Sequence, residues 1–247
     1  MSDTALAGVE AELIGKVLQL VDQIEEKTQQ LHRMVERGLP FLPPPMRMQA
    51  TTGWQKFCDS MADWWNFWRE VAADPGSPSK LHARAADWTV QVGGPVSGQV
   101  QAVDSGRLGV DDNWDGAAAK AYRDLLPAQK DALTQIKATL TDSIGDAIES
   151  VATSLVVFWT ALVVMIVPLV AAIAGATTSS ATVIGIPVGV FIALGAAATA
   201  AVGLNVAIMV LKSSVDGATA KLRQKLGDDT AFGGGWPPTA TGGPIPR

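Results

Sequence analysis

The chain has 247 residues, a formal net charge of −5 and a hydrophobic content of 48%. An acidic balance without a cluster of Lys or Arg argues against nucleic acid as its main partner. The single cysteine, Cys58, excludes an internal disulfide, and the first residues lack the basic stretch and short apolar core of a cleaved secretory signal.

Residues 1–38 are predicted to form a long amphipathic helix, because apolar residues recur at steps of three and four. The positions of this stripe are Leu6, Val9, Leu13, Val17, Leu20, Ile24, Leu31 and Val35. Two interpretations stand: the stripe packs within its own chain, or it is a coiled-coil docking site for another helical protein. After Gly38, four prolines between positions 40 and 45 predict a stiff, extended linker over residues 39–53.

Residues 54–73 are predicted to form a Trp-rich helix. Its aromatic face contains Trp54, Trp64, Trp65 and Trp68 at helical spacing. An indole combines a large apolar surface with one N–H group, which suits either a packed core or a membrane interface. The face therefore forms a seam against the first helix, or it faces lipid or a partner.

Residues 79–150 are predicted to form two antiparallel helices. Gly93-Gly94-Pro95 should interrupt or kink the first of them. The second begins at Ala117, after Trp114-Asp115-Gly116, and has no clear stop before Val151. Gly116 allows a tight turn, and we expect Trp114 to fill the gap between the two helices.

The corner sequence NWDGAAAKAY resembles the WXG superfamily of small helical hairpins, which are secreted by type VII (ESX-type) systems of actinobacteria and firmicutes. The resemblance covers residues 79–150 and implies that Trp114 and Gly116 are the hairpin-turn residues. The superfamily's Y-x-x-x-D/E export signal is not matched at Tyr122, because Leu126 stands four residues later. The fused apolar segments are similar to those of longer members, some of which are membrane-targeting toxins.

Residues 150–211 contain no Asp, Glu, Lys, Arg or His. Two apolar runs, 151–174 and 183–211, are each long enough to cross a hydrocarbon core of about 30 Å. They predict a transmembrane hairpin with membrane lipid as a partner. The second run is rich in small residues and has one strongly polar side chain; the positions concerned are Gly185, Gly189, Gly195, Gly203 and Asn205. These residues serve packing within the hairpin, or self-association into a homo-oligomer or pore.

Residues 212–226 continue as an amphipathic helix, and 227–247 form a Gly- and Pro-rich tail that we expect to be disordered. Basic residues at 212, 221, 223 and 225 follow the second run, whereas the connector between the runs is uncharged. The positive-inside tendency then places both termini in the cytoplasm of a two-span plasma-membrane protein. A short uncharged connector also suits a secreted chain that inserts into a target membrane from outside.

Nothing in the sequence indicates catalysis. His32 and His82 have no Cys or carboxylate at metal-ligand spacing, and no phosphate-binding loop or hydrolase motif is present. We therefore predict a non-enzymatic, all-α protein without cofactor or metal, built of long helices with a WXG-like helical hairpin and two C-terminal transmembrane helices. Three functions are compatible with it: a WXG-like component or substrate of a type VII system that docks helices, a pore-forming or membrane-depolarising effector, or an unrelated membrane-anchored scaffold.

Overall fold

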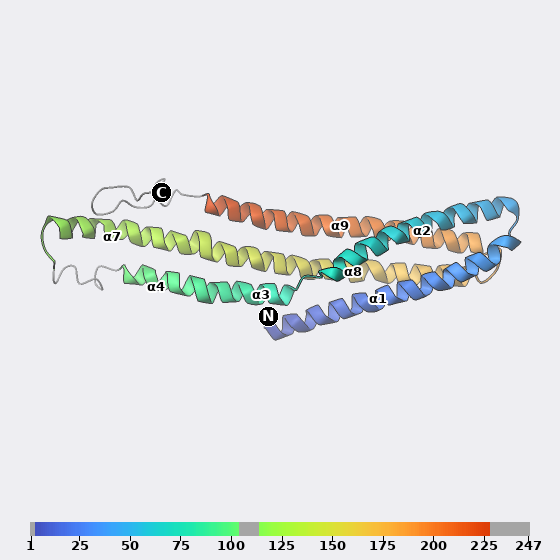
Figure 1. The fold of residues 1–247 in the computed structure, drawn as a ribbon, viewed down its shortest axis with the longest axis horizontal. Coiled ribbons are helices and arrows are strands. Elements are labelled where there is room, and N and C mark those ends of the chain that lie inside the picture. The colour runs from blue at the N-terminus through green and yellow to red at the C-terminus, as the bar shows by residue number, and fades with distance from the viewer. Residues whose placement is uncertain (1–2, 104–113, 228–247) are drawn as a thin grey trace. The chain divides into compact units, whose positions relative to one another are not determined.

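The computed structural model describes residues 3–103 and 114–227. Among these residues there are helices and turns but no strand, so the prediction of an all-α protein is confirmed (Figure 1). The chain divides into two compact units. We call Met1–Pro78 with Thr153–Ser213 the hairpin unit, and Ser79–Ala152 with Ser214–Arg247 the corner unit.

The hairpin unit begins with two long helices joined by a tight turn. Helix α1 spans Asp3–Gly38, the 3-10 helix η1 spans Leu39–Phe41, and α2 spans Pro44–Ala73. The extended linker predicted over residues 39–53 is therefore wrong from residue 44 onward. Proline at the first positions of a helix loses no hydrogen bond, since the N–H groups there have no intrahelical partner. The prolines thus start α2 instead of prolonging the connector.

The turn between α1 and α2 is closed by one side chain. The Arg47 guanidinium donates hydrogen bonds from Nη2 to the carbonyl oxygens of Pro40 at 2.7 Å and Leu42 at 3.0 Å. A charged donor on backbone carbonyls makes a comparatively strong bond. The turn therefore fixes α1 and α2 as an antiparallel pair.

Two further long helices contain the apolar runs. Helix α8 spans Asp142–Ser179 and α9 spans Ile186–Leu226. By length and composition, the continuous helical segment Ala117–Ser179 and α9 could each cross a membrane. The two predicted apolar spans are confirmed as helices, and the amphipathic segment 212–226 continues α9 without a break.

The core of the hairpin unit lies where α1 and α2 pack along α8 and α9 (Figure 1). Its largest fully buried side chains come from all four helices and from the α1–α2 turn: Trp159, Phe57, Ile24, Leu31, Leu42, Leu162, Ile166, Ile173, Ile186, Val17, Val35 and Val190. The amphipathic pattern of α1 and the apolar runs therefore share one core. We call the α1–α2 pair the cover, and residues 153–213 the apolar hairpin.

The corner unit contains the predicted antiparallel helices. The first arm consists of α3 (Pro78–Trp88), the π-helix η2 (Thr89–Gly93) and α4 (Gly94–Ala102); the second consists of α7 (Ala117–Gln135), the π-helix η3 (Ile136–Thr141) and the start of α8. Helix α4 packs on α7, and η2 packs on η3. Near the far end of the pair, His82 Nδ1 lies 2.5 Å from Glu149 Oε2.

The predicted interruption at Gly93-Gly94-Pro95 takes the form of the π-helix η2. Pro95 has no N–H to donate, and its ring crowds the preceding turn of an α-helix. A wider π turn just before it accommodates both effects. The facing arm widens as well, and the Trp88 indole Nε1 donates to the Thr141 carbonyl at 3.0 Å.

The tail predicted to be disordered, 227–247, lies outside the described residues after Gly227.

Candidate membrane-active site: the apolar hairpin

The turn of the apolar hairpin depends on two glycines at its α9 side. A Cβ at Gly185 would lie 1.9 Å from the Ser179 carbonyl oxygen, and one at Gly189 would lie 2.5 Å from that of Ala176. Both distances are shorter than real Cβ contacts, and backbone atoms do not yield as a side-chain tip does. Gly185 and Gly189 therefore act within the hairpin, which supports the intramolecular interpretation for this pair.

The other small and polar positions of α9 separate into two groups. A Cβ at Gly203 would come 3.0 Å from Met165 Sδ on α8, so Gly203 also serves contact within the hairpin. Gly195 is exposed and has no such neighbour within 4 Å. The Asn205 side chain donates from Nδ2 to the Ala201 carbonyl at 3.0 Å, within its own helix. Of the glycines predicted to pack membrane helices, Gly195 is thus the one left open to another molecule.

The cover buries the apolar stripe of α1. Val17, Leu20, Ile24 and Leu31 are buried and Leu13 packs against the core, whereas Leu6 and Val9 are half-buried. The stripe therefore packs within its own chain over most of its length. In this arrangement it is not a free docking site for another helix.

The aromatic face of α2 is also part of this core. Trp64 and Trp68 are buried, while Trp54 and Trp65 are half-buried and pack against the same cluster. Trp54 stacks on His32 of α1 with ring centroids 5.6 Å apart. The seam against the first helix is therefore the arrangement adopted. The Trp64 Nε1 is buried without a hydrogen-bond partner among the described residues.

Two glycines of the cover that are not among the predicted site residues mark a close approach to α9. A Cβ at Gly38 would lie 2.0 Å from Ile186 Cδ1, and one at Gly53 would lie 2.9 Å from Val190 Cγ1. An isolated glycine within a helical pattern usually has a packing reason. That signal is present at Gly53, within an otherwise continuous helix.

The outer face of the apolar hairpin is exposed and apolar. Only 17% of the most apolar window of α9 is buried. The large exposed side chains of the hairpin are Val157, Val164, Val167, Val183, Ile184, Val188, Phe191, Ile192, Val202, Val206, Ile208, Met209 and Val210. Contiguous exposed apolar surface on this scale marks a protein or membrane interaction site.

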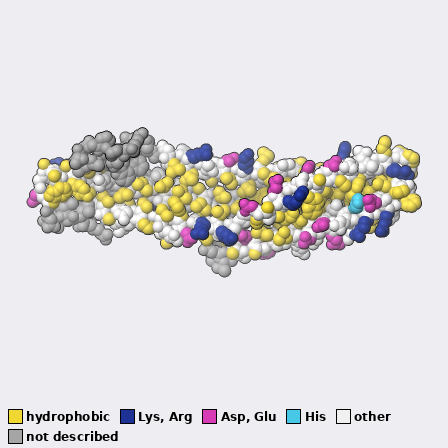
Figure 2. All heavy atoms as spheres, in the orientation of Figure 1, with side chains coloured by type: hydrophobic (Ala, Val, Ile, Leu, Met, Phe, Trp, Pro, Cys, Tyr) yellow, Lys and Arg dark blue, Asp and Glu magenta, His cyan; other side chains and the backbone are white. Residues whose placement is uncertain are grey.

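The outer face of the cover is charged, unlike the apolar outer face of the hairpin. Exposed charged residues such as Asp22, Glu26 and Arg33 lie along α1. In Figure 2, charged side chains border a band of hydrophobic atoms along the α1–α2 pair. A single Asp or Arg at the centre of a bilayer costs about 2.5–3.5 kcal/mol. The four packed helices therefore cannot enter a hydrocarbon core together.

The cover cannot leave the hairpin in water either. Burial of one large apolar side chain contributes about 1.5–3 kcal/mol. Exposing only four of the buried residues, such as Ile24, Leu31, Phe57 and Trp68, would cost more than about 6 kcal/mol, which is comparable with the whole stability of a domain. The covered arrangement is thus the form that suits water.

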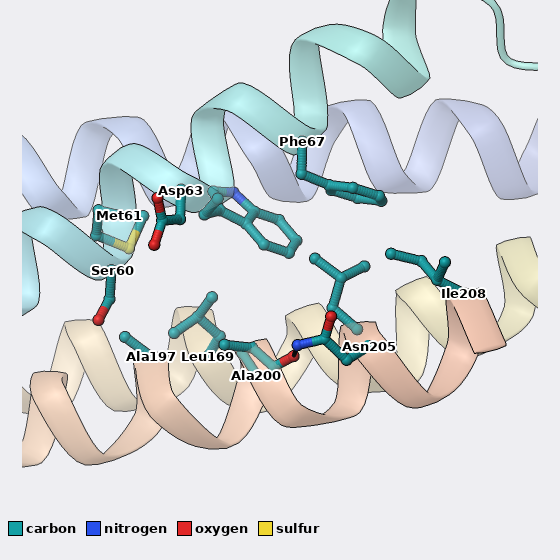
Figure 3. A pocket seen from close by; sticks show the side chains of 12 residues that line it. Ser60, Met61, Asp63, Phe67, Leu169, Ala197, Ala200, Asn205 and Ile208 are labelled. Carbon is teal, nitrogen blue, oxygen red and sulfur yellow. Dashed lines mark hydrogen bonds between the residues drawn. The ribbon is translucent and has the colours of Figure 1, made fainter.

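A cavity of about 330 Å³ separates part of α2 from the hairpin. Figure 3 shows Met61 and Phe67 of α2 on one side and Ala197 and Ala200 of α9 on the other. The alanines leave the space, because a larger side chain on α9 would fill it. Polar groups also line the cavity: Ser60, Asp63 and Asn205. Packing between cover and hairpin is therefore incomplete here.

Cys58 lies on α2 and is half-buried. Burial raises the pKa of its thiol, and the neighbouring Asp59 carboxylate raises it further. A thiol held in its neutral form is a poor nucleophile. Cys58 is thus a packing residue of the cover.

The predicted turn residues of the corner unit have different environments. Trp114 is 44% exposed and lies against Tyr122 of α7 in a tilted arrangement, with ring centroids 5.7 Å apart. The prediction that Trp114 fills the gap between two helices is therefore wrong. The second helix begins at Ala117 as predicted, and the indole contacts the Tyr122 ring near its start. Gly116 precedes α7 with φ of 101°, a conformation that favours glycine.

No group of three or more His, Cys, Asp or Glu residues suited to a metal ion occurs within residues 3–103 and 114–227.

Comparisons with protein-family models, curated proteins and solved structures found no match to the chain. The arrangement itself must therefore indicate the function. Its distinctive feature is an uncharged helical hairpin that is covered on one face and exposed on the other.

Proposed function

We propose that the chain is a non-enzymatic protein that inserts its apolar hairpin into a lipid bilayer and acts as a pore-forming or membrane-depolarising effector. The observation that carries the proposal is the outer face of the hairpin, where exposed large apolar side chains follow both helices. Such a surface is unfavourable in water and favourable in lipid. The covered, charged side gives the chain a form that can exist in water before insertion.

The tip of the hairpin supports insertion. The connection between α8 and α9, residues 180–185, carries no charge. Some of its backbone N–H and C=O groups form hydrogen bonds within the turn, because Gly185 N donates to the Thr182 carbonyl and Ile186 N to the Val183 carbonyl. Moving such a tip through a bilayer avoids the large cost of desolvating a charged side chain. Two spans then return the chain to the side from which it entered.

Self-association in the bilayer has one structural support. Gly195 lies near the middle of the second apolar run on the exposed face of α9, with open space beside it. Thr199 follows one turn later on the same face. Small residues at such positions let membrane helices of separate chains approach closely, and a hydroxyl can bond between them. We propose this face as the contact between copies in a homo-oligomer.

The proposal is tested by flotation and dye leakage with liposomes of phosphatidylcholine and phosphatidylglycerol. The variant Val202→Asp places a charge in the α9 run at a side chain that is 65% exposed, so folding in water is preserved. A carboxylate within the hydrocarbon core opposes insertion by about 2.5–3.5 kcal/mol. We expect wild-type protein to float and release dye, and V202D to lose most of both activities.

The matched control is Leu18→Asp, which makes the same kind of change on the outer face of α1, where Leu18 is 47% exposed. We expect L18D to behave as the wild type. Equal loss in both variants, or no flotation of the wild type, would contradict the proposal. Flotation without leakage would instead indicate a membrane-anchored scaffold.

A second candidate function has its own observation. The exposed Trp114, held on Tyr122 beside the Gly116 turn, presents an aromatic side chain at the end of the corner unit. Exposed tryptophan is a frequent anchor of protein interfaces. We propose as this alternative that the WXG-like corner docks a helical protein of a type VII secretion system. Loss of a co-purified helical partner on Trp114→Ala, with flotation unchanged, would support it.

A further inference from the structure

The cover is joined to the other long helices of the structure through one short segment. Helices α1 and α2 precede the other long helices, and the non-helical segment 74–77 joins α2 to α3. The opposite end of the cover, the α1–α2 turn, lies beside the tip of the hairpin, where Gly38 approaches Ile186. Every other contact between cover and hairpin is non-covalent. The cover can therefore move as one piece about residues 74–77.

The connecting segment has the features of a hinge. Gly76 has φ of +65°, which side-chain-bearing residues rarely adopt. The neighbouring Ser77 Oγ donates to Glu10 Oε1 of α1 at 2.8 Å, and this bond ties the start of the cover to the connector. Rotation about residues 74–77 gives up this bond near the hinge. The core residues of α1 and α2 that lie against the hairpin are hydrophobic.

From this topology we infer that the cover is a releasable lid: it swings about residues 74–77 when the protein meets a bilayer, the apolar hairpin enters the hydrocarbon, and the uncovered Trp face of α2 rests on the lipid surface. This inference rests on the proposed function and adds how insertion is controlled. In water the lid is closed because the two faces that meet in the core are both apolar. A bilayer offers each of these faces an alternative environment.

The composition of the released lid suits a membrane surface. Helices α1 and α2 keep charged outer faces for water, and their inner faces contain large apolar side chains for the acyl boundary. Tryptophan is enriched at that depth of a membrane. Trp64 Nε1, which has no partner among the described residues in the closed form, gains hydrogen-bond acceptors among lipid headgroups. Insertion thus relieves an unsatisfied donor of the closed form.

The cavity beside Trp64 indicates where lipid first separates lid and hairpin. It is lined by residues of both parts and holds about 330 Å³ of unfilled space. Its apolar wall includes Met61, Phe67 and Leu204. An acyl chain that enters here meets apolar atoms from α2 and α9 together. An acyl chain inserted at this point separates α2 from α9 without exposing the core to water.

The inference is tested by a reversible lock between lid and hairpin. Gly53→Cys and Val190→Cys, in a Cys58→Ser background, place two thiols where a Cβ at position 53 already lies within 2.9 Å of Val190 Cγ1. Oxidation should join α2 to α9, and dithiothreitol should release them. With the same liposomes, we expect the oxidised protein to release dye at least tenfold more slowly than the same protein after reduction.

The reduced protein is its own control for folding, and the two single-cysteine variants control for the oxidant. A second lock, Gly38→Cys with Ile186→Cys, repeats the test at the hairpin tip. Leakage by the oxidised proteins at the rate of the reduced ones would overturn the lid. Absence of leakage in wild-type and reduced proteins alike would instead overturn the proposed function, so the two failures are distinguishable.

Discussion

Gly53 of α2 lies directly against Val190 of α9, so that a Cβ at position 53 would come 2.9 Å from Val190 Cγ1. This contact joins the cover to the apolar hairpin and shows why a glycine interrupts an otherwise helix-forming sequence. Atoms added at position 53 would overlap with those of Val190. The contact therefore limits how closely the cover and the hairpin can pack. The stability of the covered form should therefore respond to this position.

Gly53→Leu is expected to lower the free energy of unfolding by about 1–3 kcal/mol, since added side-chain atoms would force α2 away from α9. The change is measured by urea denaturation in the absence of lipid. Gly15→Leu is the control, because a Cβ added at Gly15 of α1 would meet nothing within 4 Å. G15L should leave stability unchanged or raise it by up to about 1 kcal/mol. Equal effects at both positions would contradict the contact.

Ala200→Leu should stabilise the closed form by about 1–2 kcal/mol, because the added methyl groups enter the cavity between α2 and α9. Dye release from liposomes should slow in parallel. Ala198→Leu, on the exposed side of α9, adds the same atoms outside the core and should change neither the stability of the closed form nor the rate of dye release. Destabilisation by A200L would mean that the space is not available to a side chain.

Gly116→Ala should lower stability by about 1–3 kcal/mol, since φ of 101° and ψ of −174° belong to a region that only glycine adopts readily. Thermal or urea unfolding followed by circular dichroism measures the loss. Gly98→Ala on α4 is the control in the same unit, because a Cβ there meets nothing within 4 Å. A loss of the same size in G98A would show that the effect is not caused by the turn.

Cys58 should react slowly with iodoacetamide near pH 8 in the folded chain and faster in urea, because burial first and Asp59 second raise the pKa of its thiol. The folded state then binds the proton more tightly than the unfolded state. Its contribution to stability is therefore present below the ordinary thiol pKa and decreases as the pH rises above it. Cys58→Ser should remove that alkaline dependence. Equal alkylation rates in folded and unfolded chains would contradict the burial.

The long helices and the apolar hairpin could be predicted from the sequence because their signals are local. Steps of three and four mark α1, and the absence of charge from 150 to 211 marks the hairpin. The error at residues 39–53 has a local cause too. Proline ends a helix that precedes it but also suits the first turn of a new one, and Pro44 and Pro45 occupy the first turn of α2.

The candidate site could be predicted only in part, because it depends on which faces meet. Periodicity shows that α1 has an apolar face but does not name the surface that covers it. The same limit applies to the glycines of α9: Gly189 approaches the backbone of α8 while Gly195 is open, although both belong to the same small-residue pattern. Trp114 differs for a related reason: the start of α7 at Ala117 could be predicted from the sequence, but the contact of the indole with Tyr122 could not.

The most direct test of the central claim measures the depth of the hairpin in a bilayer. An environment-sensitive fluorophore is attached to a single cysteine at Val164, Val202 or Glu26 in a Cys58→Ser background; all three side chains are exposed in the closed form. With liposomes, we predict a blue shift and quenching by brominated acyl chains at positions 164 and 202 but not at 26. Water-like emission without acyl-chain quenching at both hairpin positions would contradict the account.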